Sequence, residues 1–408
     1  MTVVAIIAEY NPFHSGHLYQ IRKIREIFQD SDSDLVIISI MSGSLVQRGE
    51  LALFSKYDRA KTAVESGIDL ILELPSVYSN SPANIFAFSA VNIINKLSGV
   101  DYICFGSESG DINILDSAAG KIMSPEFEQK LTETIKANKN KGYAKNIYDL
   151  FGKLYGEEKA AVLNGSNNIL AIEYLKALKK LKSKIRPLAI KRTGADFKSA
   201  GYIREFIANP RPTDTPFTEG GCGFVLKDFI PEEAYKLSLE LINSGKFTQT
   251  RNLSCAIISH LNRLEVPEIA GIADVSAGDA YKIKRLLGFG NCFDYDTLVK
   301  NLAAKHISRS SARRMILNIF FGITKEMRLT PPDFTAVLAL NQKGGRFLNK
   351  IKKTANIKII TKPSVMINDN NKNIIYEKNL FIDNTFKLAL FNKDGETGEI
   401  RRKPYRLI

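Results

Sequence analysis

Cysteine, histidine and long apolar runs are all scarce in this chain of 408 residues. The four cysteines, Cys104, Cys222, Cys255 and Cys292, lie far apart and form no CxxC pair, so the sequence predicts no disulfide framework. No apolar run approaches the roughly 18 residues that a membrane-spanning helix needs. The first residues also lack a basic segment ahead of a long apolar one. We therefore expect a cytoplasmic protein with no membrane segment.

Acidic residues are outnumbered, with 43 Asp and Glu against 57 Lys and Arg, which gives a net charge of +14. This excess favours a polyanionic partner, because binding to nucleic acid releases counterions from its phosphates. A lysine-rich, solvated surface gives the same balance. Four basic stretches are candidate phosphate contacts, although each taken alone is more typical of a solvated helix face: 176–186, 305–314, 350–353 and 401–406.

Short apolar runs alternate with helical patterns through the first half of the chain. We expect strands at 3–8, 34–40, 69–75, 100–106 and 185–192. Helices are expected from about residue 16 and over about 56–65, 83–97, 126–136 and 168–181. Strands separated by helices of this length indicate βαβ units, and hence an α/β fold with a Rossmann-like, doubly wound parallel sheet.

The pattern changes after about residue 209. A proline-rich stretch at 210–216 predicts a boundary. We therefore divide the chain into an α/β region at 1–209, a mainly helical region at 210–330 and a small α+β region at 331–408.

Polar segments that contain glycine or histidine follow four of the predicted strands: NPFHSGH (11–17), MSGS (41–44), GSE (106–108) and KRTGAD (191–196). Because ligands bind outside the carboxyl ends of parallel strands, we expect these segments to line one rim of the sheet.

His14 and His17 are separated by Ser15 and Gly16 directly after the first predicted strand. A metal site at this pair lacks a third ligand, since Glu9 closes the strand rather than sharing the helix face. A purely structural pair stays open as an alternative. Phosphate binding explains more, because a helix that begins after a strand offers free backbone N–H groups and the positive end of its dipole. Two imidazoles can donate hydrogen bonds there as charge builds at a phosphate.

This strand–HxGH–helix arrangement resembles the nucleotidyltransferase superfamily of adenylyltransferases and class I aminoacyl-tRNA synthetases, whose sheet is of the Rossmann type. Their second motif, of the ISSTxIR kind, has its nearest match at KSAGYIRE (198–205), with Ser199 and Arg204 in the corresponding places. Gly201 stands where a threonine is usual, so one hydroxyl donor is missing. Ser199 as an ordinary helix N-cap is the alternative.

The longer segments resemble the bacterial tRNA(Met) cytidine acetate ligases. The resemblance runs over nearly the whole chain, through AEYNPFHSGHLYQI (8–21), SGSLVQRGELA (42–52), FGSE (105–108), SNNILAIEYLKAL (166–178), IKRTGAD (190–196), HISRSSARRMILNIFFGI (306–323) and LALNQKGGRFL (338–348). Ser44 replaces a usual asparagine and Ser166 a usual proline, and neither change removes a charged group from the expected site.

The resemblance implies an enzyme that activates acetate with ATP, giving acetyl-adenylate and pyrophosphate. It then transfers the acetyl group to N4 of the wobble cytidine of elongator tRNA(Met), forming N4-acetylcytidine. On this expectation 1–209 is the ATP-binding catalytic domain and 210–330 interacts with the tRNA. Mg²⁺ is expected with ATP, but no carboxylate cluster identifies its ligands and no protein-held metal site is predicted.

His14 and His17 are the implied catalytic residues. The implied nucleotide-binding residues are the segment that follows the first strand and several later positions: Ile7, Ala8, Glu9, Tyr10, Asn11, Pro12, Phe13, His14, Ser15, Gly16, His17, Leu18, Tyr19, Gln20, Gly106, Asn167, Asn168, Arg192, Ser199 and Arg204. Gln47 and Arg48 either reach the incoming cytidine or the RNA backbone, or belong to a plain connection.

Two other functions are open from the sequence. A small-molecule adenylyltransferase shares the HxGH motif, and its ATP turnover would be indifferent to acetate. A non-catalytic protein that binds RNA on this fold would release no pyrophosphate. The sequence carries no signal for an oligomeric state.

Overall fold

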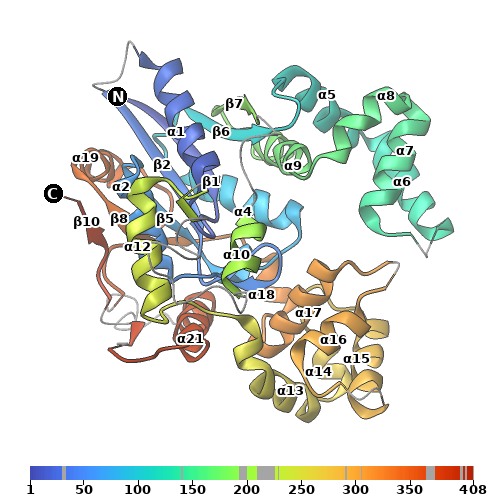
Figure 1. Cartoon of the computed structure of the whole chain (residues 1–408). Helices are drawn as coiled ribbons and strands as arrows, with labels where there is room; N and C mark the ends of the chain where they lie inside the picture. The colour runs from blue at the N-terminus through green and yellow to red at the C-terminus, as the bar shows by residue number, and fades with distance from the viewer. Residues whose placement is uncertain are drawn as a thin grey trace.

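The computed structural model describes residues 1–29, 34–138, 141–192, 200–208, 226–227, 229–289, 292–304, 306–363, 373–395, 398–399 and 402–407. A mostly parallel sheet with helices on both faces forms the centre of this part of the chain (Figure 1). The predicted Rossmann-like α/β fold is confirmed.

The sheet has eight strands among the described residues, in the order β10-β8-β5-β2-β1-β6-β7 with β9 paired to β8. Their bounds are β1 Thr2–Ala8, β2 Leu35–Ser42, β5 Leu70–Leu74, β6 Tyr102–Ser107, β7 Arg186–Lys191, β8 Phe334–Leu340, β9 Lys358–Ile360 and β10 Tyr405–Arg406. All five strands expected in the first half are present. A short hairpin outside the sheet pairs β3 (Leu45–Val46) with β4 (Glu50–Leu51).

The sheet is mixed rather than wholly parallel, because β8 runs antiparallel to β5. This corrects the expectation of a purely parallel sheet. The chain reaches β8 from the helices that precede residue 330 rather than by a βαβ crossover, so nothing constrains it to the parallel direction. An antiparallel strand added beside parallel ones is common in large α/β sheets.

Side chains of β1 alternate between two cores. Val3 and Ala5 belong to the core that also contains residues of helices α4 (Ala83–Lys96) and α9 (Ser166–Lys180). Val4 and Ile6 belong to the other core, together with residues of α1 (Ser15–Ile27), α2 (Lys56–Glu65) and α12 (Glu232–Asn243). A central strand buried on both faces explains the uninterrupted apolar run at its position in the sequence.

The helices expected near residue 16 and over 56–65, 83–97, 126–136 and 168–181 are all present. The helix expected over 126–136 is α6 (Pro125–Ala137). The other helical segments whose bounds are not given above are α3 Ser76–Ser79, α5 Ile112–Ile122, α7 Tyr143–Tyr155, α8 Glu157–Ala160, η2 Ala161–Asn164, α10 Ala200–Ala208, η3 Thr250–Leu253, α13 Ser254–Arg263, α14 Val266–Ala270, α15 Ala277–Phe289, α16 Tyr295–Leu302, α17 Arg309–Phe321, α18 Lys325–Leu329, α19 Gln342–Ile351 and α21 Ile374–Leu388. No described helix is both long and apolar enough to cross a membrane.

The three predicted regions are in contact in the structure, because parts of the second and third pack onto the first. Strands β8, β9 and β10, which come from 331–408, complete the sheet of the first region. Helix α12, from the middle region, packs on α2. Helices α13 to α17 form a group of their own beside the sheet (Figure 1). The division at 209 and 330 stays a prediction.

A buried ionic cluster fastens the C-terminal helix α21 to the sheet. The Lys56 ammonium lies 3.0 Å from Glu73, 2.6 Å from Asp383 and 3.1 Å from Glu399. Ser44 Oγ donates to Asp383 at 2.6 Å, so the same cluster holds the loop that follows β2. Removing one member of such a cluster leaves an uncompensated buried charge, which is strongly destabilising.

Candidate active site

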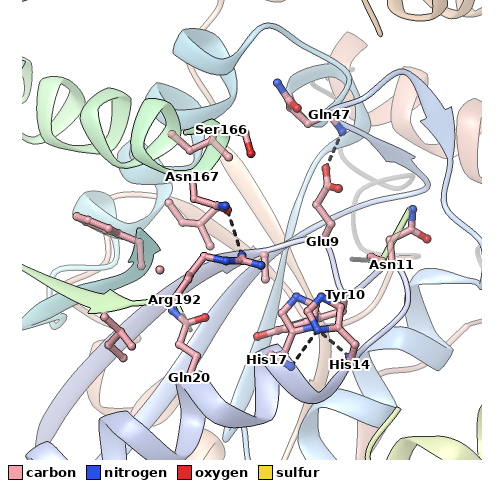
Figure 2. A pocket seen from close by; sticks show the side chains of 18 of the residues that line it. Glu9, Tyr10, Asn11, His14, His17, Gln20, Gln47, Ser166, Asn167 and Arg192 are labelled. Atoms are coloured by element: carbon pink, nitrogen blue, oxygen red, sulfur yellow. Dashed lines mark hydrogen bonds between the residues drawn. The ribbon is translucent and has the colours of Figure 1, made fainter. Parts of the chain in front are cut away.

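A cavity of about 400 Å³ lies at the carboxyl ends of β1 and β6 (Figure 2). The chain runs from β1 to β2 on one side of β1, whereas β6 lies on the other side. This is the point where the strand order reverses, and open α/β sheets bind ligands there.

Both histidines lie at the start of α1 and line the cavity. His14 is the N-cap of α1, and its Nδ1 accepts a hydrogen bond from the Gly16 N–H at 3.1 Å. His17 Nδ1 accepts from the His14 N–H at 3.2 Å. The two rings stack with their centroids 3.8 Å apart, and both line the cavity.

These hydrogen bonds fix the tautomer of both rings. Since each Nδ1 is an acceptor, the proton of a neutral ring is on Nε2, which leaves two Nε2–H donors. Burial, together with the charges of Arg192 and Arg204, lowers the pKa of His14 to about 4. Burial, His14 and Arg192 also lower the pKa of His17 well below its usual value. Both rings are therefore neutral at pH 7, and each offers one hydrogen-bond donor.

Glu9, which directly follows β1, is a half-buried carboxyl group that lines the cavity. Its Oε1 accepts a hydrogen bond from the Gln47 N–H at 2.7 Å, as Figure 2 shows. Burial raises the pKa of Glu9, while the Gln47 bond and nearby arginines act in the opposite direction. Glu9 thereby connects the end of β1 to the hairpin formed by β3 and β4.

Asn11 is almost fully buried and uses two of its groups within the protein. Its Oδ1 accepts from the Leu53 N–H at 2.7 Å, and its carbonyl accepts from Arg204 Nη1 at 2.7 Å. Its Nδ2 has no hydrogen-bond partner among the described residues. Asn11 also lines the cavity, so an unsatisfied buried amide lies close to it.

Arg192 and Asn167 meet on the opposite wall. Arg192 Nη1 donates to Asn167 Oδ1 at 3.2 Å. The Glu108 carboxylate accepts from the backbone N–H groups of Asn167 and Asn168 and so holds the first turn of α9. Although partial burial opposes the charge of Glu108, these hydrogen bonds lower its pKa below the usual value. The start of α9 is thus fixed beside the end of β6.

Comparison with known proteins places this architecture in a family. Residues 1–399 match the model of the HIGH Nucleotidyl Transferase family. The chain belongs to this family.

Its relatives share most of its length. The chain is 35% identical to the tRNA(Met) cytidine acetate ligase of Clostridium perfringens over 376 residues, which covers 89% of this chain and 90% of that protein. It is 34% identical to the enzyme of that name from Caldanaerobacter subterraneus over 397 residues, 96% of each. The crystal structure of Thermotoga maritima TmcAL bound with alpha-thio ATP matches with a TM-score of 0.87 and 28% identity, covering 100% of this chain and 99% of that one. The family resemblance seen in the sequence is confirmed.

The cavity brings together thirteen of the residues that the family resemblance implies for the nucleotide site: Ile7, Ala8, Glu9, Tyr10, Asn11, His14, Gly16, His17, Tyr19, Gln20, Gly106, Asn167 and Arg192. Other implied residues do not line it: Pro12, Phe13, Ser15, Leu18, Asn168 and Arg204. Ser199 lies outside the described residues. Of these residues, Arg204 contacts the HxGH loop from outside, through the Asn11 carbonyl.

An apolar wall of the cavity was not expected from the sequence. Phe86 of α4, Phe105 of β6 and Tyr174 of α9 line it together with Leu170. The first three are also largely buried. An aromatic residue on a buried strand or helix face has the pattern of a core position, so the sequence holds no signal that separates the two roles.

The hairpin formed by β3 and β4 contributes Gln47 and Arg48 to the rim of the cavity. Three contacts with the helical region hold this hairpin in place. The Gln47 carbonyl accepts from Arg314 Nη1 at 3.1 Å, the Gly49 carbonyl accepts from the Tyr295 hydroxyl at 3.4 Å, and Glu50 pairs with Arg313. Gly49 has φ +79°, and a Cβ there would lie 2.6 Å from the Arg314 backbone nitrogen, so only glycine fits this close contact.

Proposed function

We propose that this protein activates acetate with ATP and transfers the acetyl group to N4 of the wobble cytidine of elongator tRNA(Met). The observation that carries the proposal is the pair of neutral imidazoles, each with an Nε2–H donor, in a cavity at the switch point of a nucleotidyltransferase sheet. The names of the relatives, and the ATP analogue in the Thermotoga maritima structure, support the choice of substrates.

The first step is a displacement at the α-phosphate. An acetate oxygen forms a bond to the α-phosphorus while the bond to the bridging oxygen breaks, and pyrophosphate leaves with that electron pair. His14 and His17 donate to phosphate oxygens that gain charge in the transition state, and the positive end of the α1 dipole favours the same charge. Arg192 supplies a cation on the opposite wall. No covalent bond to the protein is required.

The second step transfers the acetyl group. The cytosine amine attacks the carbonyl carbon of acetyl-adenylate, the bond from that carbon to the phosphate oxygen breaks, and AMP departs. The amine loses one proton to the surroundings. The protein acts by holding the two reactants together, which by itself supplies a large part of such an acceleration.

Mg²⁺ accompanies ATP in this proposal and neutralises phosphate charge. No cluster of three His, Cys, Asp or Glu side chains suited to a metal ion is present among the described residues. Glu9 lines the cavity, and one of its carboxyl oxygens accepts a hydrogen bond from the Gln47 N–H. The ion would therefore be held mainly by phosphate oxygens and water, as is usual for Mg²⁺ with nucleotides.

The test is to incubate the purified protein with ATP, Mg²⁺, labelled acetate and unmodified elongator tRNA(Met), and to digest the RNA to nucleosides. Label in N4-acetylcytidine that is lost in His17→Ala supports the proposal. His260→Gln is the matched control, because His260 lies on α13, where its ring contacts Phe320. ATP turnover that ignores acetate would favour a small-molecule adenylyltransferase. RNA binding without pyrophosphate release, unchanged by His17→Ala, would favour a non-catalytic RNA-binding protein.

A further inference from the structure

A second polar cavity, of about 670 Å³, opens beside the first between the hairpin, α10 and the helical region. In Figure 1, α10 lies between the sheet and the group of helices that includes α16 and α17. Arg48 lines both cavities, so the second one adjoins the ATP site at this side chain. A volume of this size is in the range of pockets that hold a small-molecule ligand.

The lining of this cavity is rich in arginine. Five arginines face three carboxylates: Arg48, Arg204, Arg251, Arg309 and Arg313 against Glu50, Glu205 and Asp296. Glu50 lies 3.4 Å from Arg204 and also pairs with Arg313, so it compensates part of that charge. Arg309, an exposed residue at the start of α17, makes no hydrogen bond or ion pair with any described residue. The cavity therefore keeps positive charge that the fold does not use.

An aromatic side chain lies at the same cavity. Tyr202 of α10 is 39% exposed and packs edge-on against Phe229, with the ring centroids 5.7 Å apart. Arginines beside an exposed aromatic ring are the combination that binds single-stranded nucleic acid, because the guanidinium groups bind phosphates and the ring stacks on a base.

We infer that this second cavity binds the single-stranded RNA segment that flanks the acceptor base. Arg309 binds a phosphate of this segment, Tyr202 stacks on a neighbouring base, and Arg48 guides the acceptor base from the second cavity into the first. The inference rests on the proposed function, since it assumes that the acceptor is an RNA base. An unpaired loop fits because its bases can be splayed out, whereas a regular RNA duplex keeps its bases stacked.

The inference is tested with an isolated anticodon stem-loop of elongator tRNA(Met) and with the full tRNA as acceptors. For Arg309→Gln we expect the KM for the stem-loop to rise about tenfold. The rate of acetate-dependent ATP–pyrophosphate exchange, measured in the same variant as the reference, should not change with it. The slope of log KM against log salt should become shallower by about 0.7, the value for one contact to a single strand. Tyr202→Ala should raise the same KM about tenfold or more. Arg346→Gln on α19, an exposed arginine that lines neither cavity, is the matched control.

Two results would overturn the inference. One is an unchanged KM for both acceptors in Arg309→Gln and Tyr202→Ala. The other is an effect with the full tRNA but none with the stem-loop, because Arg309 would then contact the body of the tRNA. Failure of the proposed function gives a different result, namely no acetate-dependent exchange in the unmodified protein. Binding of the stem-loop, followed by fluorescence anisotropy in the same variants, still tests the second cavity in that case.

Discussion

The two cavities that adjoin at Arg48 present opposite kinds of phosphate site. The first has two neutral imidazoles at the start of α1, where burial lowers the pKa of His14 to about 4. The second has exposed arginines and an open rim. Neutral donors fixed by the backbone favour charge that develops in a transition state, whereas mobile cations favour a polyanion that arrives from solution. We therefore expect the first cavity to carry the chemistry and the second to carry RNA affinity.

The largest effect is expected where the fixed donors of the first cavity are removed. In His14→Asn the side-chain amide can still cap α1, but the Nε2–H donor is lost. Removing one donor of this kind typically costs about 10²–10³ in rate. We expect a loss of that size in the single-turnover release of pyrophosphate, with ATP and acetate but without tRNA.

The control for this experiment is the thermal unfolding of His14→Asn, which should match that of the unmodified protein because the N-cap is retained. If the variant keeps pyrophosphate release within a factor of about three, the imidazoles are not transition-state donors and the comparison between the cavities fails.

The next largest effect is expected from salt concentration, which should weaken tRNA binding much more than ATP–pyrophosphate exchange. Binding that neutralises about three phosphates of a single strand loses roughly 20-fold in affinity when salt rises from 50 to 200 mM. We expect the KM for tRNA to rise by at least this factor. The rate of ATP–pyrophosphate exchange at saturating ATP should change by less than about twofold, since buried sites are screened little. Equal salt dependence of both measurements would contradict the assignment of RNA affinity to the arginine cavity.

A smaller effect is expected at Glu50, which tests whether the cavities are independent. Glu50 pairs with Arg204, which in turn donates to the Asn11 carbonyl in the HxGH loop. In Glu50→Gln, Arg204 loses the carboxylate that orients it. We expect the KM for ATP to rise about threefold to tenfold in the exchange assay, the range for losing one ordinary hydrogen bond, because the effect reaches the site through the Asn11 carbonyl.

Glu205→Gln is the matched control for Glu50→Gln. Glu205 lies next to Arg204 on α10 and lines the same cavity, but no hydrogen bond or ion pair ties it to a described residue. Similar effects of the two substitutions would mean that only the overall charge of the cavity matters, and that Glu50 has no specific role toward Arg204.

The part of this arrangement that the sequence predicts is the part that is contiguous in the chain. Strand β1, the HxGH loop and α1 follow one another, so their apolar period and their polar residues are visible in a single stretch. The antiparallel placement of β8 beside β5 was not predicted, because it depends on where a segment docks more than 250 residues later. A register between distant strands has no local signal.

The same reason explains which site residues escaped prediction. Phe86, Phe105 and Tyr174 line the first cavity but lie on buried faces of α4, β6 and α9, where an aromatic residue is typical of a core. The hairpin that carries Gln47 and Arg48 is held by Arg313 and Arg314 of α17. Nothing near residue 47 in the sequence indicates that contact, so only the folded chain shows that the helical region orients the rim of the first cavity.

The smallest expected effect concerns pH, and it follows from the lowered pKa values in the first cavity. An imidazole with an ordinary pKa of about 6.5 would be only about 10% neutral at pH 5.5, which would reduce a rate that needs the neutral form about tenfold. Since burial lowers the pKa of His14 to about 4, this ring stays neutral at pH 5.5, and the pKa of His17 is lowered in the same direction. We expect kcat/KM for ATP in the exchange reaction to change by less than about twofold between pH 7.5 and 5.5, because this ratio reports the free enzyme.

The lowered pKa values should also make the free energy of unfolding depend on pH. Below about pH 6.5 the unfolded chain binds a proton on His14 that the folded chain does not bind until the pKa of that ring, near 4, is reached, and the lowered pKa of His17 acts in the same direction. The free energy of unfolding therefore falls as the pH is lowered from about 6.5 toward 4. His14→Asn should weaken this dependence, which denaturant unfolding at pH 7 and pH 5 measures. A pH dependence that is identical in the variant would mean that the His14 ring titrates normally, and that the first cavity is not the dry, neutral site that sets it apart from the second.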